Sequence, residues 1–330
     1  MSKYKNYITI FLPIVLIIGA LIVVSTTKKP QQSQSEPSTL NIVCTTNIIE
    51  QTLINLIQSP NTSSSQPNTP SVLDHISLTT LMGPGTDPHL YRATENDVTT
   101  LQKADVIFYN GLHLEYKLTD ILEQLAKQKR VVAISQDIDR NKLISPPEYE
   151  GNYDPHIWFD LSLWKQTVIT MKNTLIKADP SNKHIYTNNT NNYLNQLNQL
   201  ETSLRQTINT LPTKNRILIT AHDAFNYFGN AFGFTVKGLQ GISTQAEPSI
   251  KDIENLANYI ATKKVKSIFV ESSVPKRTIQ AVQEATKALN WQVSIGGELF
   301  SDALGSANTP EGTYTGMIKH NITTIVENLK

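Results

Sequence analysis

The sequence predicts an α/β protein of two lobes, each with a mainly parallel four-stranded sheet flanked by helices, joined by one long rigid helix. Three observations support this fold class. Short apolar runs rich in β-branched residues alternate with helical patterns, which is typical of parallel sheets covered on both faces. The runs fall into two groups, on either side of one unusually long helical pattern. The chain of 330 residues is also long enough for about two domains.

The first group contains four candidate strands and three candidate helices. The strands are expected at residues 40–45, 76–82, 106–110 and 131–134. The helices are expected at residues 48–57, 96–103 and 117–128. Thr94 and Asp97 have the spacing of a capping box, which marks a helix start. A tract rich in proline and serine at residues 59–71 breaks the alternation and is expected to form a surface loop.

The second group repeats this organisation. Its candidate strands lie at residues 217–221, 234–239, 267–271 and 292–295. Its candidate helices lie at residues 251–263 and 278–289. The spacing of Ser249 and Asp252 again marks a helix start. Each group therefore supplies enough strands for a sheet of its own.

The long linking helix is expected at residues 181–211. The sequence Asp179-Pro180-Ser181 is a helix-start signal, apolar residues then recur at helical spacing, and Pro212 ends the pattern. A helix of this length measures about 45 Å, which is enough to extend from one lobe to the other. Because asparagine is a mediocre helix former, the Asn-rich stretch at residues 188–192 leaves two shorter helices as an alternative.

The N-terminal segment indicates export. Lys3 and Lys5 precede an apolar run from about Ile8 to Val24, a pattern shared by signal peptides and by short membrane spans. No Ala-x-Ala cleavage motif is evident, and no cysteine follows the run closely enough to accept a lipid. We therefore favour an uncleaved membrane anchor with its positive end inside the cell. The rest of the chain is expected to be periplasmic or otherwise extracytoplasmic.

These patterns define five expected segments. They are a signal or membrane-anchor segment at residues 1–27, a polar tether at 28–39, an N-terminal α/β lobe at 40–180, the linking helix at 181–211 and a C-terminal α/β lobe at 212–330. The tether is predicted from its polar, low-complexity composition.

Composition excludes several classes of function. The formal net charge is +1 and no basic stripe with interleaved aromatic residues occurs, so nucleic acid is not an expected partner. Cys44 is the one cysteine, so neither an internal disulfide nor a Cys-rich zinc site can form. Cys44 is expected to behave as a small buried hydrophobic residue.

The tripeptide Asp-Pro-His occurs twice, ending at His89 and at His156. Asp-Pro is a common loop opener, because proline fixes φ and restricts the residue before it. A single loop histidine is more often structural than a metal ligand, so the repeat alone does not establish a site.

Four residues are nevertheless candidates for one metal site. His89, His222 and Asp302 each follow a candidate strand, and ligands of open α/β sheets bind beyond the carboxyl ends of the strands. His156 precedes a helix that is expected to start near Leu161. The four residues lie far apart in the sequence, so only a folded two-lobe structure could bring them together. A cation held by all of them would bridge the lobes.

Several longer motifs resemble one known family. They are GPGTDPHLY (83–91), ADVIFYNGLHLE (104–115), DPHIWFD (154–160), AHDAFNYFGNAFGF (221–234), GISTQAEPS (241–249), IFVESSVP (268–275), GGELFSDALG (296–305) and TPEGTYTGMIKHN (309–321). In this order they are similar to the TroA-like family, the cluster A-I solute-binding proteins of metal-importing ABC transporters. The resemblance covers about residues 40–330. It implies two α/β lobes joined by one long helix, and it implies that His89, His156, His222 and Asp302 bind the metal.

The resemblance also implies a function and partners. The chain is expected to bind one divalent transition-metal ion outside the cytoplasmic membrane and to deliver it to an ABC permease driven by its ATPase. It is expected to be monomeric and not to be an enzyme. A surface adhesin is an alternative. A metal-dependent hydrolase is less favoured, because four protein ligands leave little room for the open coordination position that such an enzyme needs.

Manganese is the favoured cargo, with zinc or iron as alternatives. Three imidazoles and one carboxylate suit several divalent ions, and zinc should bind at least as tightly as manganese at equilibrium. Zinc-specialised members of the family often have a loop rich in histidine and acidic residues before the second histidine, whereas residues 141–153 form a short segment without histidine. His222 weakens this argument, because several manganese-binding members have glutamate there.

Other residues near the motifs have less specific expected roles. His113 is expected to pack or to form hydrogen bonds, and His320 in the last helix is expected to pack or to cap the helix. His75 and His184 are expected to be exposed. Glu271 ends a candidate strand near the site and is a candidate for orienting a liganding histidine.

Overall fold

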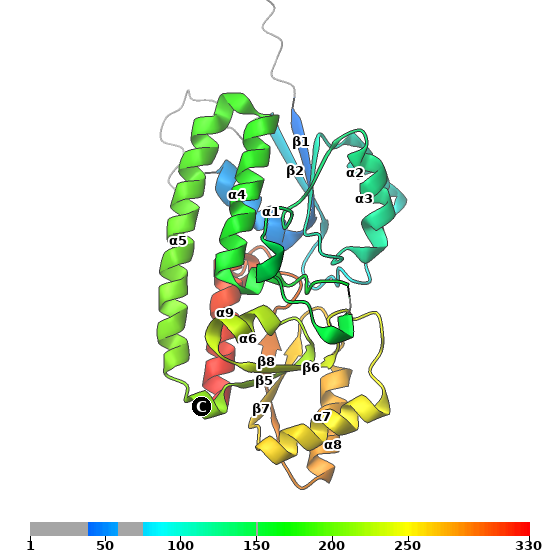
Figure 1. Ribbon diagram of the computed structural model, residues 1–330, viewed down its shortest axis with the longest axis vertical. Helices are drawn as coiled ribbons and strands as arrows, with labels where there is room; N and C mark the ends of the chain where they lie inside the picture. The colour runs from blue at the N-terminus through cyan, green and yellow to red at the C-terminus, as the bar shows by residue number, and fades with distance from the viewer. Residues whose placement is uncertain (1–38, 59–74, 150) are drawn as a thin grey trace, which may run out of the picture. The chain divides into compact units, whose positions relative to one another are not determined.

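The first four strands form one parallel sheet in the computed structural model (Figure 1). The structure describes residues 39–58, 75–149 and 151–330. The strands are β1 (Leu40–Thr46), β2 (Ile76–Met82), β3 (Val106–Tyr109) and β4 (Arg130–Ala133). Their order is β2-β1-β3-β4, and each neighbouring pair is parallel. The first predicted sheet is therefore confirmed, with each boundary within one residue of the prediction.

Alternating side chains of β1 pack on the two faces of this sheet. The helices around it are α1 (Asn47–Ile57), α2 (Glu95–Lys103) and α3 (Thr119–Ala126). Ile42 and Cys44 join the large core on the face that α1 covers, whereas Val43 joins the core formed with α2 and α3. The strand period of two explains this alternation, and a parallel sheet covered on both faces requires it. Cys44 is fully buried, as predicted.

The last four strands form two small sheets rather than the single four-stranded sheet that the sequence predicts. They are β5 (Ile217–His222), β6 (Thr235–Gln240), β7 (Ser267–Glu271) and β8 (Ser294–Leu299). Within the described residues β5 pairs with β6 and β7 pairs with β8, both in parallel. Strands β5 and β7 are neighbours, but the Glu271 carboxylate accepts the backbone N–H groups of Ala221 and His222 at 2.7 and 2.9 Å. At this end of the two strands, the Glu271 side chain therefore takes the place of a backbone hydrogen-bond partner from β7.

Strand β8 begins two residues later and ends four residues later than predicted. The predicted strand ended at residue 295, immediately before Gly296 and Gly297. In the structure both lie inside β8, where the pairing with β7 shifts register at a bulge. Gly297 has a φ of 140°, and a Cβ at Gly296 would lie 2.8 Å from the Phe269 ring. Both positions therefore require glycine.

Helices also cover the two small sheets formed by β5 to β8. They are α6 (Asn226–Phe232), α7 (Ile250–Lys263), α8 (Arg277–Ala288) and α9 (Tyr314–Leu329). Helices α7 and α8 bury Leu256, Ile260 and Ile279 against β5 and β7, and α9 packs against β8. The predicted capping boxes at the starts of α2 and α7 are both formed.

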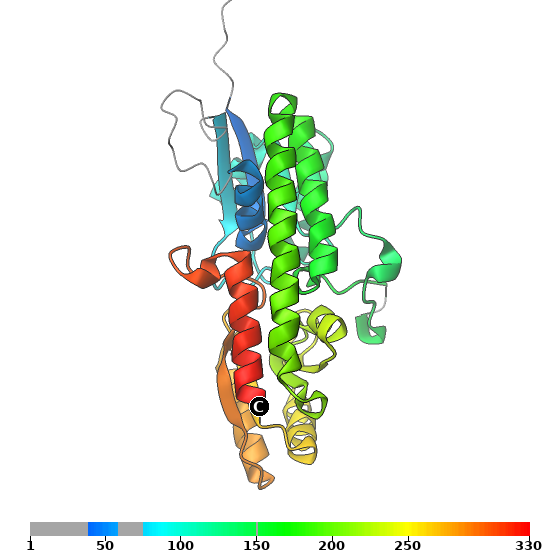
Figure 2. The ribbon, with the colours of Figure 1, turned by 90° about the vertical axis from the view of Figure 1, so that its left-hand side faces the viewer.

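The predicted linking helix is one continuous helix. Helix α5 (Lys183–Asn209) has 27 residues, so the alternative of two shorter helices is wrong. It packs against α1 and α4 (Leu161–Ala178) over one part of its length and against α9 over another (Figures 1 and 2). In the Asn-rich stretch Asn189 is buried, and its amide donates to the carbonyl of Leu56 at 3.0 Å. Packing thus compensates for a low helix propensity.

Short 3-10 turns connect these elements at Tyr116–Leu118, Arg140–Lys142, Pro147–Tyr149, Ile157–Phe159, Pro180–Asn182, Thr213–Asn215 and Pro310–Gly312. The described residues belong to one compact unit. Below, the described residues before α5 are called the first lobe and those after α5 the second lobe.

The predicted anchor at residues 1–27, the tether apart from its last residue and the loop at 59–71 lie outside the described residues. Among the residues that are described, no helix combines the length and the apolar character that crossing a membrane requires.

Candidate metal centre

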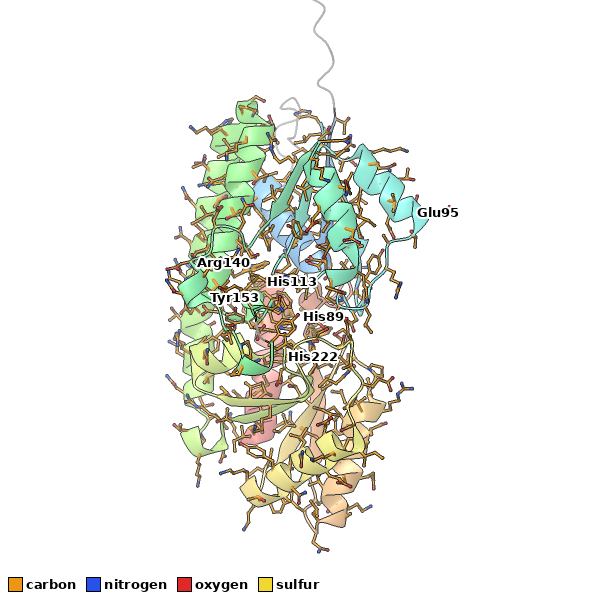
Figure 3. The ribbon with its side chains drawn as sticks, turned by 45° about the vertical axis from the view of Figure 1, so that its right-hand side comes forward. His89, Glu95, His113, Arg140, Tyr153 and His222 are labelled. Atoms are coloured by element: carbon orange, nitrogen blue, oxygen red, sulfur yellow. The ribbon has the colours of Figure 1, made fainter. Side chains whose placement is uncertain are left out.

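The fold brings the four predicted ligands together. His89 lies in the loop after β2, and His222 is the last residue of β5. Asp302 follows β8, and His156 precedes the short turn before α4. Each of the four is at most 1% exposed, and one potential ligand atom from each lies within 4.8 Å of all the others. Figure 3 shows His89 and His222 at the level where the two lobes meet.

The distances between these atoms suit one small cation. Nε2 of His89 lies 3.3 Å from Nε2 of His156. The Nε2 atoms of His156 and His222 each lie 3.4 Å from an oxygen of Asp302. Two atoms bound tetrahedrally to Zn²⁺ at about 2.1 Å lie roughly 3.4 Å apart. The cluster therefore has the dimensions of a coordination shell.

Two buried atoms of the cluster have no hydrogen-bond partner among the described residues. They are Nε2 of His222 and Oδ1 of Asp302. Buried polar atoms are nearly always paired, and an unpaired one costs about 1–3 kcal/mol. A metal ion between the four residues would pair with both atoms, so the donor set fits a cation.

Carboxylates set the orientation of two of the imidazoles. Nδ1 of His222 lies 2.6 Å from Glu271 Oε2, and Nδ1 of His156 lies 2.7 Å from Asp154 Oδ1. An ionised carboxylate can only accept, so the imidazole proton is assigned to Nδ1 and the lone pair of the neutral ring to Nε2. This arrangement is typical of metal-binding histidines. It gives Glu271 the orienting role that the sequence analysis proposed for it.

Both Asp-Pro-His tripeptides form the same backbone turn. The N–H of His89 donates to Asp87 Oδ1 at 2.8 Å, and the N–H of His156 donates to Asp154 Oδ1 at 2.9 Å. From the sequence, these aspartates are expected only to be part of a stiff Asp-Pro unit, and their hydrogen bonds were not predicted. An aspartate that accepts from the backbone two residues later is a recognised turn pattern, and this signal was available in the sequence.

Ser273 is a further residue that sequence reasoning missed. Its hydroxyl donates to Asp302 Oδ2 at 3.0 Å and lies 2.9 Å from the hydroxyl of Ser301. Serine in a loop after a strand has many roles, so nothing in the pattern singled it out. In the structure it fixes one oxygen of the carboxylate and leaves Oδ1 available.

Burial and charge oppose one another in the first-lobe histidines. Burial lowers the pKa of His89 to about 3. Burial also acts to lower the pKa of His156, but the carboxylates of Asp154 and Asp302 outweigh it and raise this pKa above its usual value. Of these two imidazoles, His156 therefore retains a proton more readily in the absence of a metal ion.

The same competition operates in the second lobe. Burial acts to lower the pKa of His222, but Glu271 and Asp302 outweigh it and raise this pKa well above its usual value. Burial acts to raise the pKa of Asp302, but His222 and His156 hold it well below its usual range. Protons on the imidazoles thus balance the carboxylates without a metal ion, and a bound cation must displace them.

The other histidines lie outside the cluster. His113 and His184 are exposed, whereas His75 is partly buried rather than exposed as predicted. Nε2 of His320 lies 3.0 Å from the Glu298 carbonyl, and its Nδ1 lies 3.4 Å from the Glu311 carboxylate. The His320 ring also packs against Phe300, with ring centroids 5.2 Å apart, as expected.

Sequence comparison places the site in a known family. Residues 69–328 match the family described as zinc-uptake complex component A, periplasmic. The chain belongs to this family. Its members are binding components of uptake systems, so the chain is a binding protein and not an enzyme. This agrees with the resemblance in the sequence motifs.

Individual relatives cover most of the chain. It is 46% identical over 257 residues to manganese-binding lipoprotein MntA of Bacillus subtilis, covering 78% of this chain and 83% of that protein. It is 47% identical over 251 residues to zinc-binding protein TroA of Treponema pallidum, covering 76% and 81% respectively.

A solved structure of a relative has a similar fold. The periplasmic zinc-binding protein TroA from Treponema pallidum matches with a TM-score of 0.82 at 42% identity, covering 88% of this chain and 99% of that one. The two-lobe fold with a long linking helix is therefore shared with that protein.

Proposed function

We propose that this protein is the extracytoplasmic solute-binding component of an ABC importer. It captures one divalent transition-metal ion and delivers it to a permease in the cytoplasmic membrane, which an ATPase drives. A relative from Streptococcus anginosus is named a manganese ABC transporter substrate-binding lipoprotein, which supports these partners. The proposal rests mainly on the buried cluster of His89, His156, His222 and Asp302.

Each lobe contributes two of the proposed ligands. We assign residues 40–180 to the N-terminal lobe, 181–211 to the linking helix and 212–330 to the C-terminal lobe. His89 and His156 then belong to the first lobe, and His222 and Asp302 to the second. An ion bound by all four residues joins the lobes within one chain, so a monomer suffices.

Manganese is the proposed physiological cargo, with zinc and iron as competing ligands. One relative is named for manganese and another for zinc. The segment at residues 141–153 lacks histidine, which supports manganese. The three imidazoles favour zinc at equilibrium, so cargo depends on metal supply as well as on affinity.

We further propose that residues 1–27 anchor the protein to the membrane. Several relatives are named lipoproteins. In this chain the one cysteine, Cys44, is buried in β1 and cannot carry a lipid without opening the first sheet. Membrane fractionation of the native host, with and without a high-salt wash, tests this. Protein that remains with the membrane supports the anchor, and protein in the soluble fraction contradicts it.

Calorimetry on the full chain tests the metal site. The protein, purified in mild detergent and stripped with a chelator, is titrated separately with manganese(II), zinc(II) and iron(II). We expect one ion per chain. His89→Ala and Asp302→Ala should each weaken binding by at least about a hundredfold, because each removes one ligand from a different lobe.

His184→Ala is the matched control, since His184 is exposed on α5. Binding that survives both ligand substitutions would refute the ligand set. In the native host, loss of manganese uptake after deletion of the gene would support the transport role, and unchanged uptake of all three metals would contradict it.

A further inference from the structure

Each Asp-Pro-His aspartate also reaches across to the second lobe. One carboxylate oxygen holds the backbone of the histidine, as described above. The other accepts a hydrogen bond from a second-lobe side chain. Thr244 Oγ1 donates to Asp87 Oδ2 at 2.6 Å, and Asn226 Nδ2 donates to Asp154 Oδ2 at 3.1 Å. Each aspartate therefore links a proposed ligand to the opposite lobe.

The two loops differ in the number of additional hydrogen bonds that join them to the second lobe. Around Asp154, the Tyr227 hydroxyl donates to the Asp154 carbonyl at 3.0 Å and accepts the Ile144 N–H at 3.1 Å. Two residues beyond His156, Trp158 Nε1 donates to the Ser301 carbonyl at 2.9 Å. These bonds all join the first lobe to the second. The loop that carries His156 is thus tied to the second lobe at several points.

The loop that carries His89 is tied less firmly. Among the described residues, the bond from Thr244 is the one hydrogen bond that joins residues 83–91 to the second lobe. Asp87 is partly exposed, whereas Asp154 is fully buried. Separation of the lobes on this side breaks one hydrogen bond instead of several.

Thr244 is itself fixed from the second lobe. Gln240 Nε2 donates to the carbonyls of Thr244 and Ala246 at 3.3 and 2.9 Å. Gln240 ends β6 and pairs in register with His222 on β5. The hydroxyl that holds Asp87 is therefore built onto the same strand pair that positions a proposed ligand.

A groove lies beside the loop that carries Thr244. Its volume is about 440 Å³. It is lined from the first lobe by His113, Tyr116, Tyr149 and Asn152, and from the second by Ser243, Gln245 and Ala246. Ser243 and Gln245 flank Thr244, so the weaker link lies at the edge of an open groove.

We propose that the Thr244–Asp87 hydrogen bond is a latch that sets how long the metal ion stays bound. When it breaks, the loop carrying His89 separates from the second lobe and the ion leaves on this side of the site. The loop carrying His156 stays attached to the second lobe during release. This inference rests on the proposed function, since it names the residue that controls release from that same site.

The test compares the rate of metal release in three variants. Manganese(II) is loaded onto the full-length protein, and its transfer to an excess of chelator is followed by stopped-flow. Thr244→Val keeps the shape and removes the donor, so we expect release about tenfold faster, the effect of losing a hydrogen bond to a charged group. Thr244→Ser keeps the hydroxyl and should release at nearly the wild-type rate. Tyr227→Phe removes a link on the other side and should stay within about twofold of wild type.

Two further measurements test whether faster release comes from a changed metal coordination or from a destabilised fold. The electron paramagnetic resonance spectrum of bound manganese(II) should be the same in Thr244→Val and wild type, because the four ligands are unchanged. The melting temperature without metal should fall by no more than about 4 °C, since one hydrogen bond is lost.

Release from Thr244→Val at the wild-type rate, or faster release from Tyr227→Phe than from Thr244→Val, would overturn the latch while leaving the proposed function intact. A wild-type chain that binds no ion would overturn the proposed function and the latch together.

Discussion

The two Asp-Pro-His loops share a backbone turn and differ in what surrounds it. In both, the aspartate accepts the N–H of the histidine, at 2.8 and 2.9 Å. In the second loop Asp154 also accepts from Nδ1 of its own histidine, at 2.7 Å. In the first loop Asp87 makes its other bond to Thr244 across the lobe boundary.

The difference separates local from tertiary causes. The tripeptide fixes the turn, because proline and the aspartate side chain act within three residues. Both aspartates bridge the lobes, and burial and the contacts with the second lobe decide whether the aspartate also orients its imidazole. One short sequence therefore serves two purposes, and four substitutions can distinguish them.

The largest expected effect is the loss of one imidazole from each loop. His156→Ala and His89→Ala should each weaken manganese(II) affinity by at least about a hundredfold, since even substitution of a supporting residue around a metal ligand typically costs 10–100-fold. Calorimetry on the stripped full-length protein measures this. If His89→Ala binds like wild type, the first loop supplies no ligand and the comparison between the loops fails.

A smaller effect should come from the aspartates, and it should be unequal. Asp154→Asn removes the acceptor that orients His156, so we expect a loss of affinity of about 10–100-fold. Asp87 holds the backbone of His89 rather than its imidazole. The loss of metal affinity in Asp87→Asn should therefore stay below about tenfold. The same titrations measure both variants. A larger loss for Asp87→Asn would show that the two loops have been assigned the wrong roles.

Glu271 extends the comparison to the second lobe, where it orients His222 as Asp154 orients His156. Glu271→Gln should weaken metal affinity about tenfold, because the neutral amide is a poorer partner for Nδ1. Glu254→Gln on the exposed face of α7 is the matched control. Equal affinities of the two variants would mean that the 2.6 Å contact has no influence on the metal.

The smallest effects should come from the helix caps, one in each lobe. Thr94→Ala and Ser249→Ala each remove a side-chain acceptor of a capping box, which should lower the free energy of unfolding by about 1 kcal/mol. Urea denaturation measures this loss. Metal affinity should stay within about twofold of wild type in both, and a larger change would show that the site responds to any local weakening.

The sequence was most informative about features that depend on a short local stretch of residues. The strands of the first sheet are continuous apolar runs bounded by turn residues, so their limits were predicted to within one residue. His222 and Asp302 were singled out because they follow strands. The complete ligand set came from the resemblance, because residues this far apart in the chain carry no local signal of their proximity.

Features that depend on long-range contacts were missed. The predicted second sheet is two small sheets, and at the ends of β5 and β7 the Glu271 carboxylate accepts the N–H groups of Ala221 and His222. No pattern within either strand indicates this. The last part of β8 was missed, because it pairs with β7 beyond a bulge that becomes evident only when the two strands are paired. The contacts of Thr244 and Ser273 arise only when distant loops meet.

Cys44 gives the protein a built-in reporter of its own opening. The thiol lies in β1 with no exposed surface, and burial raises its pKa far above the usual value. A thiol reagent therefore reacts only with molecules in which this strand has separated from the helix that covers it. An ion that binds only the folded chain makes such molecules rarer by the factor 1 + [L]/Kd. The labelling rate of this one thiol thus reports metal occupancy, and no cysteine has to be introduced into the protein.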